Sequence, residues 1–240
     1  MPNAFAMKLS GYAVLSDADV AALVGATGPS RTVRGRYDLI REGDKPGPVL
    51  VVLDGWACRY KVLRDGERQI TAFMLPGDFC DLHVAELDAM DHSIGAVSDC
   101  HVASIPRDAM DALLGVSPAL THALWRSQLV DEAVMRAWIV GIGRREGLER
   151  VAHLMLELYA RMRAVGLAAE GGCAMPLTQA VLADALGLTP VHVNRVLRTL
   201  RERGVMELGS GTLSIVRPAE LARIAGFDDN YLHKRMRAAA

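Results

Sequence analysis

The segment from Pro190 to Arg203 carries side chains suited to binding a polyanion. Read as a helix, its outward face bears Val191, His192, Asn194, Arg195, Arg198, Arg201 and Arg203. Glu202 is the one acidic residue among them. Arginine and asparagine can form paired hydrogen bonds with guanine and adenine, so Arg195 and Asn194 have the chemistry for base edges. Arg201 and Arg203 lie near the helix end, where phosphate contact is expected. A basic helix face is usually just solvated, so the surrounding elements are needed to show whether this one binds nucleic acid.

Two short helices joined by a tight turn are expected to position this face. Thr178 and Thr189 suit the cap positions, and Pro190 suits the first helical position of the second helix. Gly187 lies in the turn, as in a helix-turn-helix. The apolar interior is expected from Leu182, Ala183, Leu186, Leu188, Val193, Val196 and Leu197. Together these features predict DNA binding. The residues expected at the DNA are Thr178, Gln179, Thr189, Val191, His192, Asn194, Arg195, Arg198 and Arg201.

A two-stranded hairpin is predicted directly after the second helix. Apolar residues in 205–208 and 212–216 flank Gly209, Ser210 and Gly211. A hairpin in this place completes a winged helix-turn-helix, with the tip of the wing near the DNA backbone.

The region from Thr32 to about Pro106 predicts an all-β domain. Short apolar runs alternate with glycine-containing turns at a spacing of about 8 to 12 residues, as in a small antiparallel barrel or sandwich. Asp65-Gly66 is the clearest hairpin signal, and a type I′ turn is expected there.

A long helix is predicted from Pro118 to about Ile142, because Ser117 can cap it and no further proline interrupts it. It carries an apolar stripe, for which two readings remain open: packing on the chain's own β domain, or the seam of a two-stranded dimer. The stripe and its flanking residues are Leu120, Ala123, Leu124, Val130, Val134, Ala137 and Trp138. The Gly141-Ile142-Gly143 sequence is expected to interrupt the helix as a hinge, with helical pattern resuming over 144–165 and a loop over 167–174.

Length and composition limit the class of protein. A chain of 240 residues with 51% hydrophobic and 23% charged residues predicts two globular domains and excludes a largely disordered chain. Residues 1–143 hold 13 basic against 18 acidic residues, whereas 144–240 hold 14 against 10. The second part is therefore the one suited to a polyanion.

The sequence lacks the patterns of a membrane span, a secretory signal and a cysteine framework. The longest aliphatic run, over 48–53, is far short of the roughly 20 residues needed to span a bilayer, and residues 1–9 do not resemble a secretory signal. A cytoplasmic location is expected. Cys58, Cys80, Cys100 and Cys173 are scattered without a CxxC pair, which argues against a disulfide framework and a zinc knuckle.

The order of these parts resembles the Crp/Fnr family of bacterial transcription regulators. The likeness rests mainly on Leu177–Gln179 and Leu186–Leu197, and also on Leu53–Trp56 and Leu75–Phe79. It implies an α+β fold: a cyclic-nucleotide-binding-like β roll (1–116), a dimerisation helix (117–142) and a winged helix-turn-helix (143–240). It further implies a homodimer on a pseudo-palindromic site, with the helix stripe at the dimer seam, and contact with RNA polymerase in activators.

The resemblance also gives roles to single residues. Arg195 falls on the family's base-reading arginine. Val191 stands where better-known members have a base-reading glutamate, and Pro190 where some have another arginine. These departures imply an operator different from the familiar ones.

An effector pocket is implied at Gly77, Asp78, Phe79, Asp91 and His92. Cyclic-nucleotide binders hold the ribose with a Gly-Glu pair and the phosphate with an arginine, but 88–98 contains neither arginine nor lysine. We therefore expect an effector other than cyclic AMP, or none. No cofactor is expected. The oxygen sensors of the Crp/Fnr family carry a cysteine cluster near the N-terminus, whereas the first cysteine here is Cys58. A metal or haem site is also disfavoured, because structural roles suit the available side chains better, namely Cys80, His83, His92 and His101.

Two other functions fit the sequence less well. A small-molecule or redox sensor acting mainly on a protein partner is disfavoured by the arginines of 190–203, which are most useful on nucleic acid. An enzyme is disfavoured because the sequence has no glycine-rich phosphate loop, no HExxH and no GxSxG motif.

Overall fold

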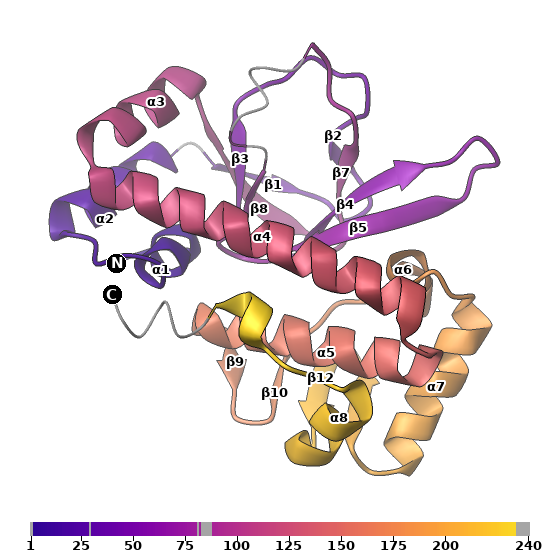
Figure 1. Ribbon diagram of the computed structural model, residues 1–240. Helices are drawn as coiled ribbons and strands as arrows, with labels where there is room; N and C mark the ends of the chain where they lie inside the picture. Colours follow the sequence, from indigo (N-terminus) through magenta and orange to yellow (C-terminus); the bar gives the residue numbers. More distant parts are fainter. Residues whose placement is uncertain (1, 29, 81, 83–87, 234–240) are drawn as a thin grey trace. The chain divides into compact units, whose positions relative to one another are not determined.

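Two short helices precede the strands in the computed structural model, which describes residues 2–28, 30–80, 82 and 88–233. The Asn3 side chain caps α1 (Ala4–Ser10), and a capping box between Ser16 and Asp19 begins α2 (Asp17–Ala26). The chain forms two compact units (Figure 1). One comprises Met1–Lys61 and Thr71–Asp131, and the other comprises Val62–Ile70 and Glu132–His233.

The first unit is built around two four-stranded sheets, so the predicted all-β region is confirmed. Their strand orders are β1-β8-β3-β6 and β2-β7-β4-β5. The strands are β1 (Ser30–Val33), β2 (Asp38–Ile40), β3 (Val49–Asp54), β4 (Ala57–Val62), β5 (Arg68–Met74), β6 (Phe79–Cys80), β7 (Ser93–Ala96) and β8 (Cys100–Ile105). Side chains from both sheets, among them Val52, Ile94 and Val102, share one apolar core.

The hairpin between β4 and β5 does not turn as expected. The Gly66 N–H donates to the Leu63 carbonyl at 3.0 Å, and the Leu63 N–H donates to the Glu67 carbonyl at 2.8 Å. Gly66 has a φ of 89°, whereas Asp65 is not among the described residues with a positive φ. A type I′ turn needs positive φ at both central residues, so that prediction is wrong. Three loop residues form a turn that ends in a left-handed glycine.

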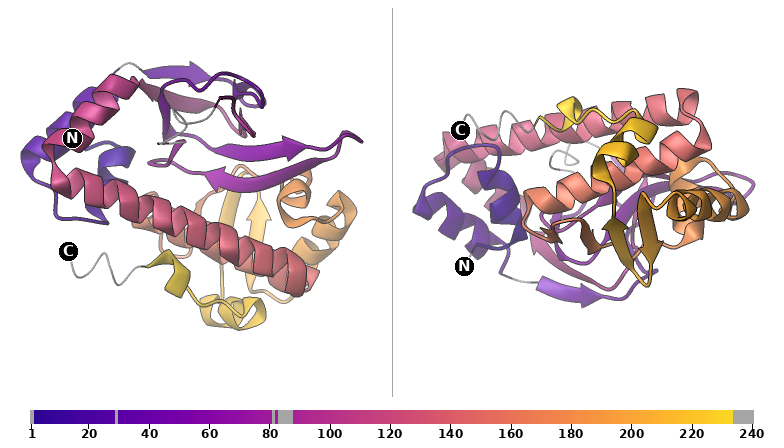
Figure 2. Two further views of the ribbon diagram at one scale, coloured as in Figure 1. Left: turned by 45° about the horizontal axis from the view of Figure 1, so that its top comes forward. Right: turned by 90° about the horizontal axis from the view of Figure 1, so that it is seen from below.

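Helix α3 (Arg107–Val116) leads into α4 (Pro118–Arg144), whose start is capped by Ser117 Oγ accepting from the Leu120 N–H at 3.2 Å. The predicted interruption at Gly141 and Gly143 is wrong. The Arg145 N–H still donates to the Gly141 carbonyl at 3.1 Å, and both views of Figure 2 show α4 unbroken. A glycine inside a helix costs only about 1 kcal/mol relative to alanine, too little to break a long helix. The break comes instead at residues 145–146.

Helix α5 (Gly147–Ala164) is the centre of the second unit. It contacts α7 (Pro190–Glu202) and α8 (Pro218–Ala225), while α6 (Gln179–Leu186) contacts α7. A single 3₁₀ turn, η2 (Asn230–Leu232), follows α8. In the described part of the chain, no helix combines the length and the apolar character needed to cross a membrane.

The predicted wing is confirmed as β11 (Met206–Gly209) and β12 (Thr212–Ile215). Ser210 and Gly211 connect the strands with φ values of 51° and 73°, as a type I′ turn requires. The prediction of a loop over 167–174 is wrong. It contains β9 (Ala168–Ala169) and β10 (Gly172–Ala174), which extend the wing sheet to the order β11-β12-β10-β9. β10 pairs with β12, far away in the sequence, so the local pattern could not reveal it.

Candidate nucleic-acid interface

Two side-chain caps and one glycine fix the helix-turn-helix. Thr178 Oγ1 accepts from the Val181 N–H at 3.3 Å, and Thr189 Oγ1 accepts from the His192 N–H at 3.2 Å. Gly187 ends α6 in the left-handed conformation with a φ of 61°, which glycine adopts readily. The predicted caps and turn are therefore confirmed.

Apolar side chains hold α6 and α7 together. The buried members are Leu182, Ala183, Leu186, Val193, Val196 and Leu200. Leu188 and Leu197 are half-buried. Because Val193, Val196 and Leu200 define the inner side of α7, the direction of its opposite side is also fixed.

The outer side of α7 is open to solvent. All nine residues expected at the DNA are exposed: Thr178, Gln179, Thr189, Val191, His192, Asn194, Arg195, Arg198 and Arg201. At 3.6 residues per turn, Val191, Arg195 and Arg198 fall on the side opposite the buried residues, with Asn194 and Arg201 beside them. Arg198 Nε donates to Glu202 Oε1 at 2.7 Å, so the one acidic group of this face is paired with a cation.

His192 lies at the flank of this face. A Cβ built on Gly147, the first residue of α5, would come within 2.7 Å of His192 Nε2. The ring therefore lies against the start of α5. This position separates His192 from the central residues Val191 and Arg195.

Arg217 is a residue of this region that the sequence reasoning missed. It follows β12, and its Nε donates to the Gly204 carbonyl just beyond α7 at 3.0 Å. Its Nη1 also lies 2.8 Å from Glu220 Oε2. A cation at the carboxyl end of a helix is favourable, so Arg217 ties the wing to the end of α7. Its place directly after the wing's last apolar residue was the available signal.

Two family models match the two halves of the chain. The cyclic nucleotide-binding domain matches residues 31–116, and the Crp-like helix-turn-helix domain matches residues 149–224. The nitrogen fixation regulation protein FixK of Bradyrhizobium diazoefficiens is 31% identical over 175 residues, which cover 72% of each chain. This chain belongs to the Crp/Fnr family.

Other Crp/Fnr proteins align over more of the length. FixK of Azorhizobium caulinodans is 28% identical over 221 residues, 92% of this chain and 88% of that protein. The solved structure of FixK2 from Bradyrhizobium japonicum has a TM-score of 0.73 and 26% identity, covering 83% of this chain and 98% of that one. The α+β class is thereby confirmed. Crp/Fnr proteins are transcription regulators with a helix-turn-helix DNA-binding domain, and not enzymes.

The Asp78 carboxylate of this Crp/Fnr protein is already bonded inside the chain. Lys8 Nζ lies 2.7 Å from Asp78 Oδ1, and the Leu75 N–H donates to Oδ2 at 2.8 Å. Phe79 is buried, and a Cβ on Gly77 would come within 2.6 Å of the Ala4 carbonyl. α1 therefore covers this turn, so the implied pocket residues Gly77, Asp78 and Phe79 serve its packing.

Lys8 is charged despite its burial. Burial alone would lower the pKa of the ammonium, but the carboxylates of Asp131 and Asp78 outweigh it, and the pKa is raised. Asp131 Oδ1 lies 3.8 Å from Lys8 Nζ. One cation thus joins α1 to the β6 turn and to α4.

Asp91 and His92 lie before β7, in the other sheet. Arg59 Nε donates to His92 Nε2 at 3.1 Å, and His92 Nδ1 lies 2.6 Å from Asp91 Oδ1. The bond to His92 lowers the pKa of Asp91. Arg59 is a cation that the inspection of 88–98 alone could not find. Of the residues of the implied pocket, Asp78 is therefore bonded to Lys8, whereas Asp91 and His92 form a separate group with Arg59.

The stripe expected at the dimer seam is largely covered by the chain itself. Leu120, Ala123, Leu124, Val130, Val134 and Trp138 are buried, and Ala137 is half-buried. Trp138 shows the reason, because its Nε1 donates to both carboxylate oxygens of Glu157 on α5, at 3.0 and 3.2 Å. Within the chain these residues are covered, Trp138 by α5 and not by the β domain that the first reading named, so they offer little surface to a second copy.

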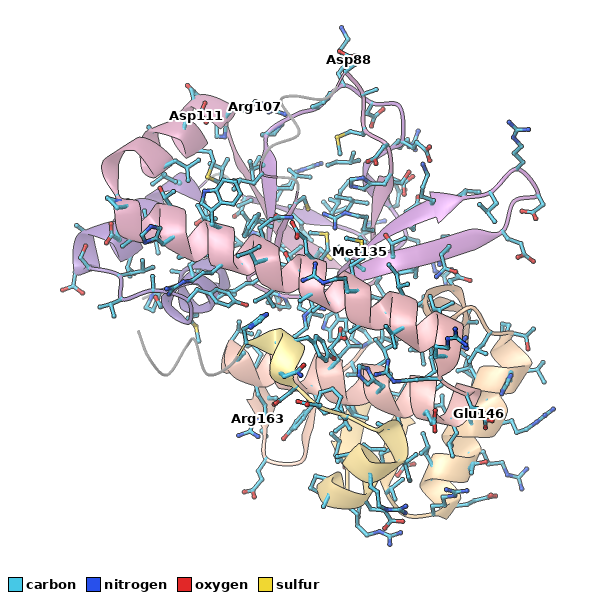
Figure 3. The ribbon with its side chains drawn as sticks, in the orientation of Figure 1. Asp88, Arg107, Asp111, Met135, Glu146 and Arg163 are labelled. Carbon is cyan, nitrogen blue, oxygen red and sulfur yellow. The ribbon has the colours of Figure 1, made fainter. Side chains whose placement is uncertain are left out.

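A different face of α4 is exposed. Its large apolar residues are Trp125, Leu129, Met135, Ile139, Val140 and Ile142. Met135 is labelled on α4 in Figure 3. Trp125, Met135, Ile139 and Ile142 fall on alternating three- and four-residue steps, if Gln128 and Glu132 are counted between the first two. This spacing is that of a coiled-coil seam.

Glu157 is a fully buried carboxylate in the second unit. Besides Trp138, it accepts from the Tyr231 hydroxyl at 3.0 Å and lies 3.5 Å from Arg161 Nη1. Burial raises the pKa of Glu157, and Arg161 and the hydrogen bonds oppose that change. His153 stacks on Tyr231 at 5.8 Å between ring centroids. The group fastens α4, α5 and η2 together.

The four cysteines are buried as free thiols. Burial raises the pKa of Cys100 and of Cys173 to about 11 in each case. Among the residues that the structure describes, no three His, Cys, Asp or Glu side chains are grouped as a metal site would require. His83 lies outside the described residues.

Proposed function

We propose that this chain is a sequence-specific transcription regulator that acts as a homodimer on a pseudo-palindromic operator. The observation that carries the proposal is the outer face of α7, where exposed Asn194, Arg195 and Arg198 lie opposite its buried side. Caps at both helices and the Gly187 turn hold this face rigidly. Such a helix fits the major groove of B-DNA.

The exposed residues divide into base-reading and phosphate-binding groups. Arg195 and Asn194 lie early in α7 and have the donors for guanine and adenine edges. Arg198 and Arg201 lie later, where the helix approaches the backbone, and Thr178, Gln179 and Thr189 offer polar groups at the helix starts. His192, at the flank near Gly147, is assigned to a phosphate and not to a base.

The exposed face of α4 supplies the dimer contact in this proposal. Ile139 is 65% exposed, and five other large apolar residues share its helix face. A second copy with the same face would bury these side chains in a symmetric seam. The two α7 helices would then read successive major grooves, about 34 Å apart.

The division of labour follows the family: a sensor domain over 1–116, a dimerisation helix over 117–142 and a DNA-binding domain over 143–240. The family models that match 31–116 and 149–224 support it. We place the hinge at residues 145–146, where α4 ends and Glu146 starts the next helix (Figure 3). A chromosomal operator places the protein in the cytoplasm.

The effector in this proposal is not cyclic AMP, if one exists. The Asp78 carboxylate is already bonded to Lys8. Arg59 contacts His92, but the Asp91 carboxylate lies beside that ring and would repel a cyclic phosphate that approached the Arg59 guanidinium. Calorimetric titration with cyclic AMP should show no heat of binding at micromolar concentrations. Micromolar affinity would contradict this part of the proposal.

Selection from a pool of random DNA duplexes tests the proposal. The wild type should enrich an inverted repeat whose half-site centres are about 10 base pairs apart. Arg195→Ala should enrich the same repeat weakly or without its guanine, whereas Arg34→Ala, at an exposed arginine of the first unit, should behave as wild type. A lack of any enriched repeat, or a single unrepeated site, would overturn the homodimeric reader.

A further inference from the structure

Val191 is an apolar side chain displayed at the centre of the outer face of α7. It is 70% exposed, at the second position of the helix. Arg195 follows it by four residues and Arg198 by seven, so the three lie in one row along the helix. The row begins with an isopropyl group and continues with two guanidinium groups.

The fold itself does not account for this valine. The residues of α7 that pack inward are Val193, Val196 and Leu200, on the opposite side. A β-branched side chain also has lower helix propensity than the straight-chain residues suited to an exposed position. Val191 therefore adds neither core packing nor helix stability, which leaves its surface as the property that matters.

The chemistry of the groove offers one matching group. In the major groove, thymine alone carries a methyl group, and an apolar side chain can recognise it by contact. Val191 has no donor or acceptor, so it cannot satisfy the cytosine amino group or the purine edges, and it would desolvate them without compensation. Val191 should therefore favour binding at thymine and disfavour binding at the other three bases.

We propose that Val191 reads a thymine methyl group in each half of the operator. Residues one helical turn apart lie about 6 Å from each other along the axis. The thymine should therefore lie within about two base pairs of the guanine read by Arg195, given the 3.4 Å rise of DNA. This inference rests on the proposed function and assigns one letter of its operator.

Base analogues test the contact directly. In duplexes carrying the enriched operator, replacing the thymine of one half-site by uracil should weaken binding about fourfold, which corresponds to the free energy of burying one methyl group. Where cytosine is placed there instead, 5-methylcytosine should bind more tightly than cytosine by a similar factor. Val191→Ala should respond to neither change, because the contacting methyl groups are gone.

Control variants separate this contact from general effects. Val14→Ala changes a valine of similar exposure, 72%, in the first unit, and it should keep the full response to uracil. Val191→Thr retains one γ-methyl group and should keep part of it. If the wild type binds its operator but tolerates uracil at every thymine, the inference is overturned while the proposed function stands. If no operator is enriched, the proposed function fails and this inference fails with it.

Discussion

Arg150 on α5 donates from Nη1 to the Leu186 carbonyl at the end of α6, over 2.6 Å. Its Nη2 donates to the carbonyls of Ile142 and Arg145 at 3.0 and 2.9 Å, where α4 ends. One guanidinium therefore satisfies carbonyls at the carboxyl ends of two helices, which would otherwise lack partners. It links the turn after α4 to the first helix of the helix-turn-helix, within the second unit.

Removal of this guanidinium should destabilise the second unit. We expect Arg150→Ala to lower the free energy of unfolding by about 3 kcal/mol, because hydrogen bonds to a charged group are lost and carbonyls are left without donors. Arg150→Lys should recover little, since a single ammonium cannot reproduce the planar fork. Urea unfolding measures both, and Arg144→Ala, at a neighbouring exposed arginine, is the control. A loss no larger than that of Arg144→Ala would contradict the assigned role.

His153 should make stability depend on pH. Burial, assisted by the charge of Arg145, lowers the pKa of His153 from 6.5 to about 4. Between these values the unfolded chain binds a proton that the folded chain does not, so stability should fall as pH decreases from 6.5 toward 4. His153→Phe preserves a ring against Tyr231 and should lose this component. Urea unfolding at pH 7, 6 and 5 measures it, and His101→Phe, at an exposed histidine, should keep the wild-type slope.

Lys8 and Asp78 should behave as a coupled buried pair. Lys8→Met leaves the Asp78 carboxylate buried without its cation, which should cost about 3 to 5 kcal/mol of stability. Lys8→Met combined with Asp78→Asn removes the uncompensated charge and retains an oxygen for the Leu75 N–H, so it should be less destabilised than Lys8→Met alone. Thermal and urea unfolding of the wild type, Lys8→Met, Asp78→Asn and the double variant complete the cycle. Additive losses would show that the two side chains are energetically independent.

Ile139 tests the dimer face. Ile139→Asp places a charge in the symmetric seam, where burial of unpaired carboxylates should raise the dissociation constant of the dimer by at least about 100-fold. Sedimentation velocity at micromolar concentration should then show a monomer, and operator affinity should fall with it. Val14→Asp, at an exposed valine of the first unit, should leave the dimer intact. A dimer that survives Ile139→Asp would place the seam elsewhere.

Local signals predicted the helix-turn-helix well. The caps Thr178 and Thr189 and the turn at Gly187 depend on residues within three or four positions, and the structure contains each as expected. The wing was predictable for the same reason, since Ser210-Gly211 determines its own turn. The type of turn at Asp65-Gly66 was not predicted correctly, because the loop there has three residues and not two.

Features that depend on distant partners could not be predicted. Residue spacing predicted one apolar stripe on α4. The bond from Trp138 to Glu157 on α5 shows why that stripe is covered, and the exposed face that contains Ile139 was not predicted. Asp78 is paired with Lys8, 70 residues away. The Arg59 contact with His92 likewise joins β4 to the residue just before β7, so it follows from the fold and not from the local pattern.

Capture of genomic DNA tests the central claim most directly. Purified protein is mixed with sheared DNA from its own genome at near-physiological salt, and the retained fragments are sequenced, with Arg195→Ala treated in parallel. We expect the wild type to enrich fragments upstream of genes that share a two-fold symmetric motif, and the variant to lose or relax that motif. Fragments without a common motif, or the same motif from both proteins, would contradict a regulator that reads DNA through Arg195.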